Sequence, residues 1–346
     1  MIIIIIIVDW EEDLKPIMKR KWFHFSLLVL LILLLTACGA KSSSAPEKSA
    51  EDGNAAGQEK KADENETRTI DYLGKTYTVP AKAERIVITG SMETMEDALV
   101  LGVKPLGGIT VGGKFPDMFK EITGSTVSIG EKAQPNMETI LKLKPDVIFA
   151  TTKFPPDVIG KLEKIAPTIP VSHISTNWEA NLRLLAELTG KQDAAEQALQ
   201  QYKDDLAEAK AKLGDRLKEK KVVIVRIRNG NIMIYPEDVF FNPSLYMDLG
   251  LTAPQEIKQA KAQEMISLEK FSEMNPDYIF VQFSEDENKD QPNALENLQK
   301  NPIWQSINAV KNNKVFVNVV DPLAQGGTAW SKIHFLKAAV EKLGNE

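Results

Sequence analysis

Two arginines, Arg226 and Arg228, stand two positions apart at the end of an apolar run that begins at residue 221. Alternate side chains of an extended strand leave the same face, so the two guanidinium groups are expected roughly 6 to 7 Å apart. Unpaired cations at that spacing repel each other, and arginine binds carboxylates and related oxyanions in a planar, bidentate manner. The pattern predicts an anion site. The alternative is that acidic residues of the same lobe pair with one or both arginines.

Further residues could complete such a site. Lys132 and Lys153 lie in predicted loops of the other half of the chain, and these additional cations favour the anion-site hypothesis. Tyr235, Phe240 and Trp330 could supply apolar walls, with ordinary core packing as the alternative for each.

The sequence lacks the residue patterns that catalysis requires. No Gly-x-Ser-x-Gly elbow, His-Glu-x-x-His pair or Gly-x-x-x-x-Gly-Lys run is present. Only His173 and His334 follow the predicted signal peptide, and the chain has one Cys. A bare transition metal prefers His, Cys or clustered carboxylates, whereas a metal wrapped in an organic chelate needs only shape, cations and aromatic faces. We therefore expect a binding protein without a cofactor, not an enzyme.

The elements that position these residues are short buried strands. Apolar, β-branched runs cover residues 85–89, 146–150, 221–225, 278–281 and 314–318, and helical patterns with charged outer faces separate them. This alternation predicts an α/β fold with parallel, Rossmann-like sheets covered on both faces. Ligands of such sheets bind outside the carboxyl ends of the strands, which is where the arginine pair falls.

An internal repeat predicts two lobes of the same design. Residues 137–150 align without a gap on residues 268–281, each copy being a helix ended by Pro, a turn at Asp and a strand. We expect an N-terminal α/β lobe over 69–190 and a C-terminal α/β lobe over 220–346. Between them, residues 191–219 carry an apolar stripe at three- and four-residue steps, which predicts one long, rigid connecting helix.

The N-terminus carries an export signal. A basic start at Met18 leads into an apolar run over 25–35 and then Leu35-Thr-Ala-Cys38. About ten to twelve apolar residues are too few to span a bilayer, so the run indicates a secretory signal peptide and not a membrane helix. Leu-x-Ala-Cys is the bacterial lipobox, which makes Cys38 the lipid-modified first residue. An uncleaved membrane helix with an incidental Cys is the alternative.

These features divide the N-terminal region. The signal peptide covers 18–37, and residues 1–17 are interpreted as a mis-assigned start. Residues 38–68 hold almost no large apolar side chain, so they predict a flexible, lipid-held tether with a reach of roughly 30 Å. The location predicted is the outer face of the cytoplasmic membrane. With 48 acidic and 42 basic residues, the chain lacks the basic excess of a nucleic-acid binder.

Several stretches resemble one family. Residues 69–346 resemble the substrate-binding proteins of ferric siderophore and cobalamin ABC importers, known as class III periplasmic-binding proteins. The matching stretches are Glu84-Arg-Ile-Val, the run from Pro135 to Ile148, Ile165-Ala-Pro-Thr, Asp248-Leu-Gly-Leu, Asn275-Pro-Asp-Tyr-Ile and the run from Asn301 to Lys311. The resemblance implies two α/β lobes joined by a long helix, and a monomer that serves a permease dimer with its ATPase. It also implies that Glu138 and Glu269, equivalent in the repeat, dock into the permease. Solvated helix-start carboxylates are the alternative for both.

The resemblance also bears on the ligand. The Arg-x-Arg strand end and the Lys after Gly130-Glu131 resemble the branch that carries ferric complexes of citrate-based hydroxamate or carboxylate siderophores. A catecholate siderophore is the first alternative, because its ferric complex is more negative still. A haem or cobalamin carrier on the same scaffold is the second. Haem would need an axial ligand, for which only Met92, His334 or Tyr235 is available.

Overall fold

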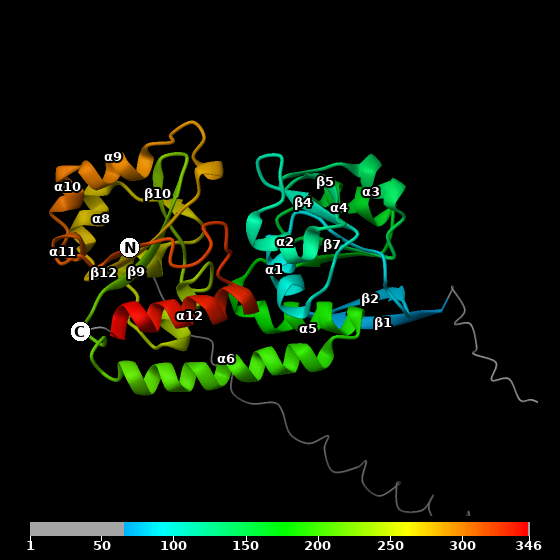
Figure 1. Cartoon of the computed structure of the whole chain (residues 1–346), viewed down its shortest axis with the longest axis horizontal. Helices are drawn as coiled ribbons and strands as arrows, with labels where there is room; N and C mark the ends of the chain where they lie inside the picture. The colour runs from blue at the N-terminus through cyan, green and yellow to red at the C-terminus, as the bar shows by residue number, and fades with distance from the viewer. Residues whose placement is uncertain (1–65, 345–346) are drawn as a thin grey trace, which may run out of the picture. The chain divides into compact units, whose positions relative to one another are not determined.

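Two sheets with different strand orders form the framework of the protein (Figure 1). The computed structural model describes residues 66–344. The predictions for the signal peptide, for Cys38 and for nearly all of the tether therefore lie outside the described residues. Residues 61–346 cluster as one compact unit. Within the described part, none of the helices combines the length and apolar character needed to cross a bilayer.

The first sheet is six-stranded and parallel except at one edge. It belongs to what we name the N-terminal lobe, together with the helices that follow its strands. In sheet order the strands are β6 (Gln134–Pro135), β5 (Val127–Glu131), β4 (Gly107–Thr110), β3 (Ile86–Ile88), β7 (Val147–Thr151) and β8 (Thr168–Val171), with only β5 and β6 antiparallel. The helices are α1 (Met92–Leu101), α2 (Lys120–Thr123), α3 (Met137–Leu143), α4 (Pro156–Glu163) and α5 (Trp178–Thr189), with short turns η1 (Asp117–Phe119) and η2 (Ser175–Asn177). A separate antiparallel hairpin, β1 (Thr67–Tyr72) and β2 (Lys75–Pro80), precedes them.

The second sheet has five strands and belongs to what we name the C-terminal lobe. Its order is β11 (Glu264–Met265), β10 (Asn231–Ile234), β9 (Val222–Arg228), β12 (Tyr278–Phe283) and β13 (Val315–Val317). The helices are α7 (Gln255–Gln259), α8 (Leu268–Met274), α9 (Ala294–Lys300), α10 (Pro302–Gln305) and α11 (Asn308–Lys311), with the π-helical turn η3 (Ser244–Asp248) and the 3-10 turn η4 (Glu285–Glu287).

This second sheet is mixed and not fully parallel. Strand β10 returns antiparallel to β9 through Asn229 and Gly230, whose φ angles of 47° and 76° are both positive. Asn-Gly favours such a two-residue hairpin turn because both residues tolerate a left-handed backbone. The prediction of parallel sheets is therefore correct for the central strands, while β6, β10 and β11 pair antiparallel at the edges.

The internal repeat corresponds to one structural unit used twice. Helices α3 and α8 both end at a residue with φ of 47°, Lys144 and Asn275, and Pro-Asp follows each of them. The carboxylate of Asp146 accepts a hydrogen bond from the backbone N–H of Arg85, and that of Asp277 accepts one from Lys221. In both lobes the turn after the helix is therefore tied to the start of the neighbouring strand. The repeated Asp has the same function in each copy.

Two helices connect the lobes. Helix α6 (Gln192–Leu213) falls within the predicted 191–219, and it packs along α12 (Ala329–Gly344). On α12, Phe335 belongs to the core of the C-terminal lobe, whereas Leu336 belongs to the core beneath the six-stranded sheet. The last helix thus contributes to both cores instead of to the C-terminal lobe alone.

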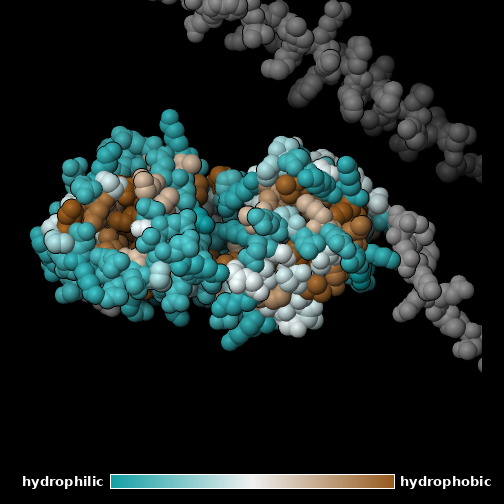
Figure 2. All heavy atoms as spheres, turned by 90° about the horizontal axis from the view of Figure 1, so that it is seen from above, coloured by the Kyte–Doolittle hydropathy of each residue, from teal (hydrophilic) through white to brown (hydrophobic). Residues whose placement is uncertain are grey.

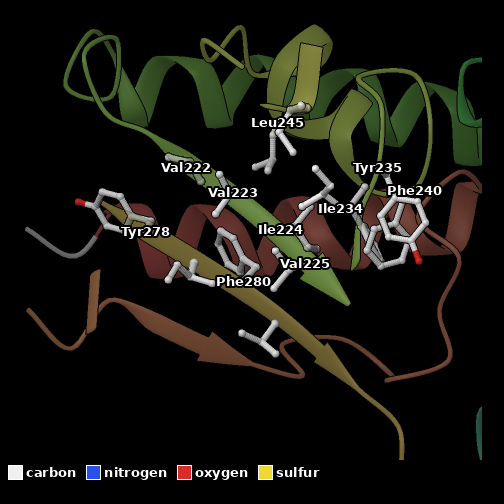
Figure 3. Packing of buried hydrophobic residues seen from close by; sticks show 14 of the residues in the cluster. Val222, Val223, Ile224, Val225, Ile234, Tyr235, Phe240, Leu245, Tyr278 and Phe280 are labelled. Carbon is white, nitrogen blue, oxygen red and sulfur yellow. The ribbon is translucent and has the colours of Figure 1, made fainter. Parts of the chain in front are cut away.

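The core of the C-terminal lobe explains the apolar run that precedes the arginines. Strand β9 is buried on both faces from Val222 to Ile227. Figure 3 shows its valines and Ile224 beside Phe280 of β12, with Leu245 approaching from η3. Continuous burial on both faces is what a central parallel strand between helices requires. Arg226 is thus buried within this strand, and Arg228 at its end is partly exposed.

Candidate ligand-binding cleft

A cleft of about 960 Å³ lies where the carboxyl ends of strands from both sheets face each other. Lys132 follows β5, Lys153 follows β7, and Arg226 and Arg228 end β9. All four predicted cations line the cleft. In the view from above, a furrow between the lobes has mostly hydrophilic residues on both sides (Figure 2). The position agrees with the rule that open parallel sheets bind ligands beyond the ends of their strands.

The arginine pair has an acidic partner. Arg226 Nε lies 2.7 Å from Glu287 Oε2, and Arg228 Nη2 lies 3.0 Å from Glu287 Oε1. The expectation of an unpaired arginine pair is therefore wrong, and the alternative of an acid from the same lobe is correct for both. Glu287 ends the turn that follows β12, and β12 pairs with β9 in the sheet. Adjacent strand ends thus bring together residues that are about sixty positions apart.

Two of the predicted aromatic residues support this pair from behind. The Phe240 ring lies 5.5 Å from Arg226 Cζ, a distance at which cation–π attraction applies, and it stacks on Tyr235. The Tyr235 hydroxyl donates to Gln263 Oε1, which also accepts from Arg228 Nη1 at 2.7 Å. Both rings are buried and neither lines the cleft. They hold the arginines instead of forming walls of the cleft.

Trp330 lies elsewhere. It lines a separate cavity of about 870 Å³, formed with η1, the 318–322 loop and α12, and its ring stacks on His334. This position contradicts its predicted role in the cleft. Helix α12 buries Ala329, Ser331 and Lys332, and the helical period then turns Trp330 towards the other cavity.

The lysines from the N-terminal lobe differ in their partners. Lys153 Nζ lies 3.0 Å from Oε1 of the buried Glu93. Lys132 Nζ donates to Gln325 Oε1 at 3.1 Å, and the described part of the chain offers it no carboxylate within 4 Å. Burial lowers the pKa of Lys132 to about 8; the charges of Lys153 and Arg226 act in the same direction, while those of Glu93 and Glu287 oppose it.

Sequence reasoning missed several residues of the cleft. Strand alternation paired Arg226 with Arg228, but the sequence gave no signal for acidic or amide groups supplied by loops. The carboxylates that line the cleft are Glu131, Asp286 and Glu287. Its amides are Asn229, Asn231, Gln263 and Gln325, and its larger apolar side chains are Met92, Val111, Phe154, Met233, Met265 and Leu323. Of these carboxylates, Glu287 pairs with the two arginines, whereas Glu131 accepts hydrogen bonds from Thr110, Gly112 and Gly113.

The two predicted docking glutamates lie in the first turns of equivalent helices. Asn136 caps α3 and Ser267 caps α8, each accepting a hydrogen bond from a backbone N–H of the first turn. The Glu138 side chain is 76% exposed and pairs only with Lys142 on its own helix, while Glu269 is exposed. Both carboxylates are favoured by the helix dipole and accessible from solvent.

Direct metal binding and haem ligation find little support in this geometry. Across residues 66–344, His, Cys, Asp and Glu side chains nowhere gather in a group of three or more that could hold a metal ion. Met92 lines the cleft, but His334 lines the other cavity and Tyr235 lies behind the arginines. Of the three residues considered as axial haem ligands, Met92 lines the cleft and the other two do not.

Comparison with known proteins identifies relatives of this chain. The family model described as periplasmic binding protein matches residues 87–318. The iron-uptake system-binding protein of Bacillus subtilis (strain 168) is 56% identical over 306 residues, which cover 88% of this chain and 93% of the relative. The Fe(3+)-citrate-binding protein YfmC of the same organism is 27% identical over 275 residues, 78% of this chain and 82% of the relative.

A solved structure extends the comparison. The crystal structure of the triscatecholate siderophore binding protein FeuA from Bacillus subtilis, complexed with ferri-bacillibactin, matches with a TM-score of 0.78 and 60% identity. The match covers 80% of this chain and 98% of that chain. It confirms the predicted α/β fold class.

Proposed function

This chain belongs to the periplasmic binding protein family, and from that premise we propose that it captures a ferric triscatecholate siderophore and delivers it to an ABC importer. Members of this family bind their substrates and do not transform them, so the chain is not an enzyme. The observation that carries the proposal is the ring of four cations, two from each lobe, around one cleft.

The net charge of the ferric complex differs between siderophore classes and favours one of them. The deprotonated oxygens of three catecholates outweigh the charge of one Fe³⁺, so the complex is strongly negative over a large surface. Glu287 already pairs with Arg226 Nε and Arg228 Nη2, so a ligand that bonds to these two donors must replace the ion pair. A desolvated ion pair is costly to break without a new partner of comparable charge. A highly charged chelate therefore suits the cleft better than a weakly charged one.

The relatives favour the same class. The citrate-type ligand, expected from the Arg-x-Arg strand end, corresponds to a relative only 27% identical to this chain. The structure complexed with ferri-bacillibactin belongs to a protein 60% identical to it. The catecholate alternative thus replaces the citrate-type hydroxamate or carboxylate as our proposal. Catechol rings can also lie against guanidinium and ammonium groups through cation–π contacts.

The proposed delivery to the importer depends on residues that lie outside the cleft. A lipid on Cys38 would hold the protein at the outer face of the membrane, and Glu138 and Glu269 would contact the permease dimer. Replacement of Cys38 by Ser should release the protein into the medium, and the mass of the processed N-terminus measures whether a lipid is attached. A processed protein in which Cys38 is unmodified and internal would contradict the anchor.

Tryptophan fluorescence quenching tests the ligand class. The purified protein is titrated with ferric bacillibactin, ferric citrate and a ferric trihydroxamate under one buffer condition. We expect ferric bacillibactin to bind at least about tenfold more tightly than the others, a difference of about 1.4 kcal/mol. Equal affinities, or a preference for the hydroxamate, would overturn the proposed class.

A further inference from the structure

Glu93 is a buried carboxylate directly beneath the lysines of the cleft. It lies in the first turn of α1, just after β3, and its side chain is 5% exposed. Oε1 accepts a hydrogen bond from Lys153 Nζ, while Oε2 is buried with no hydrogen-bond partner. A buried carboxylate costs several kcal/mol unless nearby charges compensate it. Core packing does not explain why a charged side chain is buried at this position.

The charges around Glu93 keep it ionised. Burial alone would raise its pKa, but Lys153, Lys132 and its own backbone N–H at the start of α1 together lower the pKa below its usual value. Glu96 and Asp97 on the same helix are acidic neighbours, and the ring of His173 faces the group from beyond β8. The negative charge of Glu93 therefore persists at neutral pH.

Lys132 also responds to the charge of Glu93. Its ammonium is held by the neutral Gln325 side chain and not by a carboxylate. Burial, Lys153 and Arg226 all disfavour its protonated form, and Glu93 is the strongest of the influences that favour it, ahead of Glu287. Replacing Glu93 by a neutral residue should therefore lower the pKa of Lys132 further.

We propose that Glu93 is a positioning residue that fixes Lys153 in the cleft and keeps Lys132 protonated, so that both lysines meet the anionic cargo as charged groups. This inference rests on the proposed capture of a ferric siderophore and adds the residue that sustains its charge recognition. If electrostatic repulsion between Glu93 and the anionic ligand were the only effect, removing the negative charge of Glu93 should strengthen ligand binding. If Lys132 loses its proton as a result of that removal, ligand binding should weaken instead.

The variant Glu93→Gln separates the two expectations. The affinity for ferric bacillibactin is measured from about pH 7 to about pH 10 for wild type, Glu93→Gln, Lys132→Arg and the double variant. Wild-type affinity should fall above about pH 8, by at most about tenfold per pH unit, as one proton is lost. In Glu93→Gln the fall should begin at least about one pH unit lower, because an adjacent opposite charge shifts a pKa by about 1 to 3.

The arginine variants isolate the proton on Lys132. A guanidinium stays charged throughout this range, so Lys132→Arg shows only the pH dependence of the ligand and of the remaining residues. In that background, Glu93→Gln should leave the pH profile unchanged. A shift of the profile that persists in the double variant would overturn the role assigned to Lys132.

A measurement without siderophore keeps the inference falsifiable if Glu93→Gln folds poorly. The ¹³Cε shifts of labelled lysines are followed by NMR, and the Lys132 signal is assigned by its loss in Lys132→Arg. Lys132 of the wild type should titrate near pH 8. Titration above about pH 10, the ordinary lysine value, overturns the inference. Failure of every ferric siderophore to bind would refute the proposed function, while the titration would still decide the role of Glu93.

Discussion

Glu287 decides what charge a ligand meets at the end of β9. Its two carboxylate oxygens are divided between Arg226 and Arg228, and the backbone N–H of Asn229 donates to its carbonyl oxygen. The arginines are thus held in fixed positions, and Glu287 already neutralises part of their positive charge. A ligand that binds the arginines is therefore expected to compete with the Glu287 carboxylate.

Arg226→Ala tests this competition. The variant loses a charged contact to the ligand and leaves Glu287 facing the cargo with one partner fewer. We expect the affinity for ferric bacillibactin to fall by about tenfold to a hundredfold, the range of a charge-assisted hydrogen bond. Fluorescence titration measures the change, with Arg183→Ala as the charge-matched control, since Arg183 pairs with Glu196 away from the cleft.

A second substitution, at Glu287, measures how much of the lost affinity is due to repulsion between Glu287 and the ligand. If Glu287 opposes the cargo once Arg226 is gone, Arg226→Ala with Glu287→Gln should bind more tightly than Arg226→Ala alone. Equal affinity of the single and double variants would show that Glu287 does not compete with the ligand. Contacting residues are expected to couple in this manner, and a double-mutant cycle measures the coupling.

At the scale of elements, one buried acid joins α1 to the segment that leads into α12. Glu96 accepts hydrogen bonds from the Gln325 backbone N–H and from the hydroxyls of Thr328 and Ser331. Burial raises the pKa of Glu96 from 4.5 to about 7, although these donors oppose the shift. The folded chain therefore binds this proton more tightly than the unfolded chain does.

The sign of the resulting pH dependence follows from that difference. Because the folded-state pKa is raised, the stability associated with protonated Glu96 is present at low pH and is lost as pH rises from about 4.5 through about 7. Wild type should lose up to about 3 kcal/mol across this window relative to Glu96→Gln, which cannot ionise. Urea unfolding at several pH values measures it, with the exposed Glu138→Gln as control. Parallel pH profiles for wild type and Glu96→Gln would contradict the assignment.

The segment that leads into α12 passes close to other parts of the chain at two glycines, Gly326 and Gly327. Gly326 has φ of 83°, and a Cβ there would lie 2.3 Å from the carbonyl carbon of Phe240. A Cβ on Gly327 would lie 2.3 Å from Ser175 Oγ. The chain can therefore cross at this point only without side chains.

Gly326→Ala should lower the free energy of unfolding by about 2 to 5 kcal/mol, from left-handed strain and overpacking together. Gly160→Ala in α4 is the matched control, since a Cβ there meets no atom within 4 Å. The control should be neutral or stabilising by up to about 1 kcal/mol. Denaturant unfolding compares the two variants. Similar free energies of unfolding for the two variants would contradict the predicted steric clash at Gly326.

Much of the architecture could be predicted because it depends on local patterns. The apolar, β-branched runs located the ends of β7 and β9, and the cations that follow these strands line the same cleft. The repeat of Pro-Asp after a helix predicted the same turn in both lobes, and Asp146 and Asp277 occupy equivalent positions.

What could not be predicted depends on contacts between segments that are distant in sequence. No pattern around Glu287 shows that it pairs with two arginines about sixty positions earlier, since only the β9–β12 pairing brings them together. The direction of Trp330 depends on where α12 begins and on what it packs against. The role of Gln325 follows from the path of a loop with no periodicity at all.

At the scale of the whole molecule, the proposed binding cleft and the proposed docking glutamates lie on different surfaces. The cleft lies between the lobes, while Glu138 and Glu269 are exposed at the starts of α3 and α8, one on each lobe. Neither glutamate lines the cleft. Ligand affinity and transport are therefore expected to be separable by mutation.

The double variant Glu138→Ala with Glu269→Ala should bind ferric bacillibactin with unchanged affinity but fail to support uptake. Uptake of radioactive iron by cells that lack the wild-type protein measures transport, and fluorescence titration measures affinity. Lys142→Ala is a suitable control, because it removes the partner of Glu138 and keeps the carboxylate. Normal uptake by the double variant would remove both residues from the proposed docking surface.

Helix α12 is the last element of the chain, and its sixteen residues complete both cores. Its buried Lys332 also pairs with Asp248 and lies against the rings of Trp178 and Tyr202. Domains of a nascent chain ordinarily fold one after another as they leave the ribosome. Here neither half can complete its core until α12 has been made, so the two lobes are expected to fold together instead of one after the other.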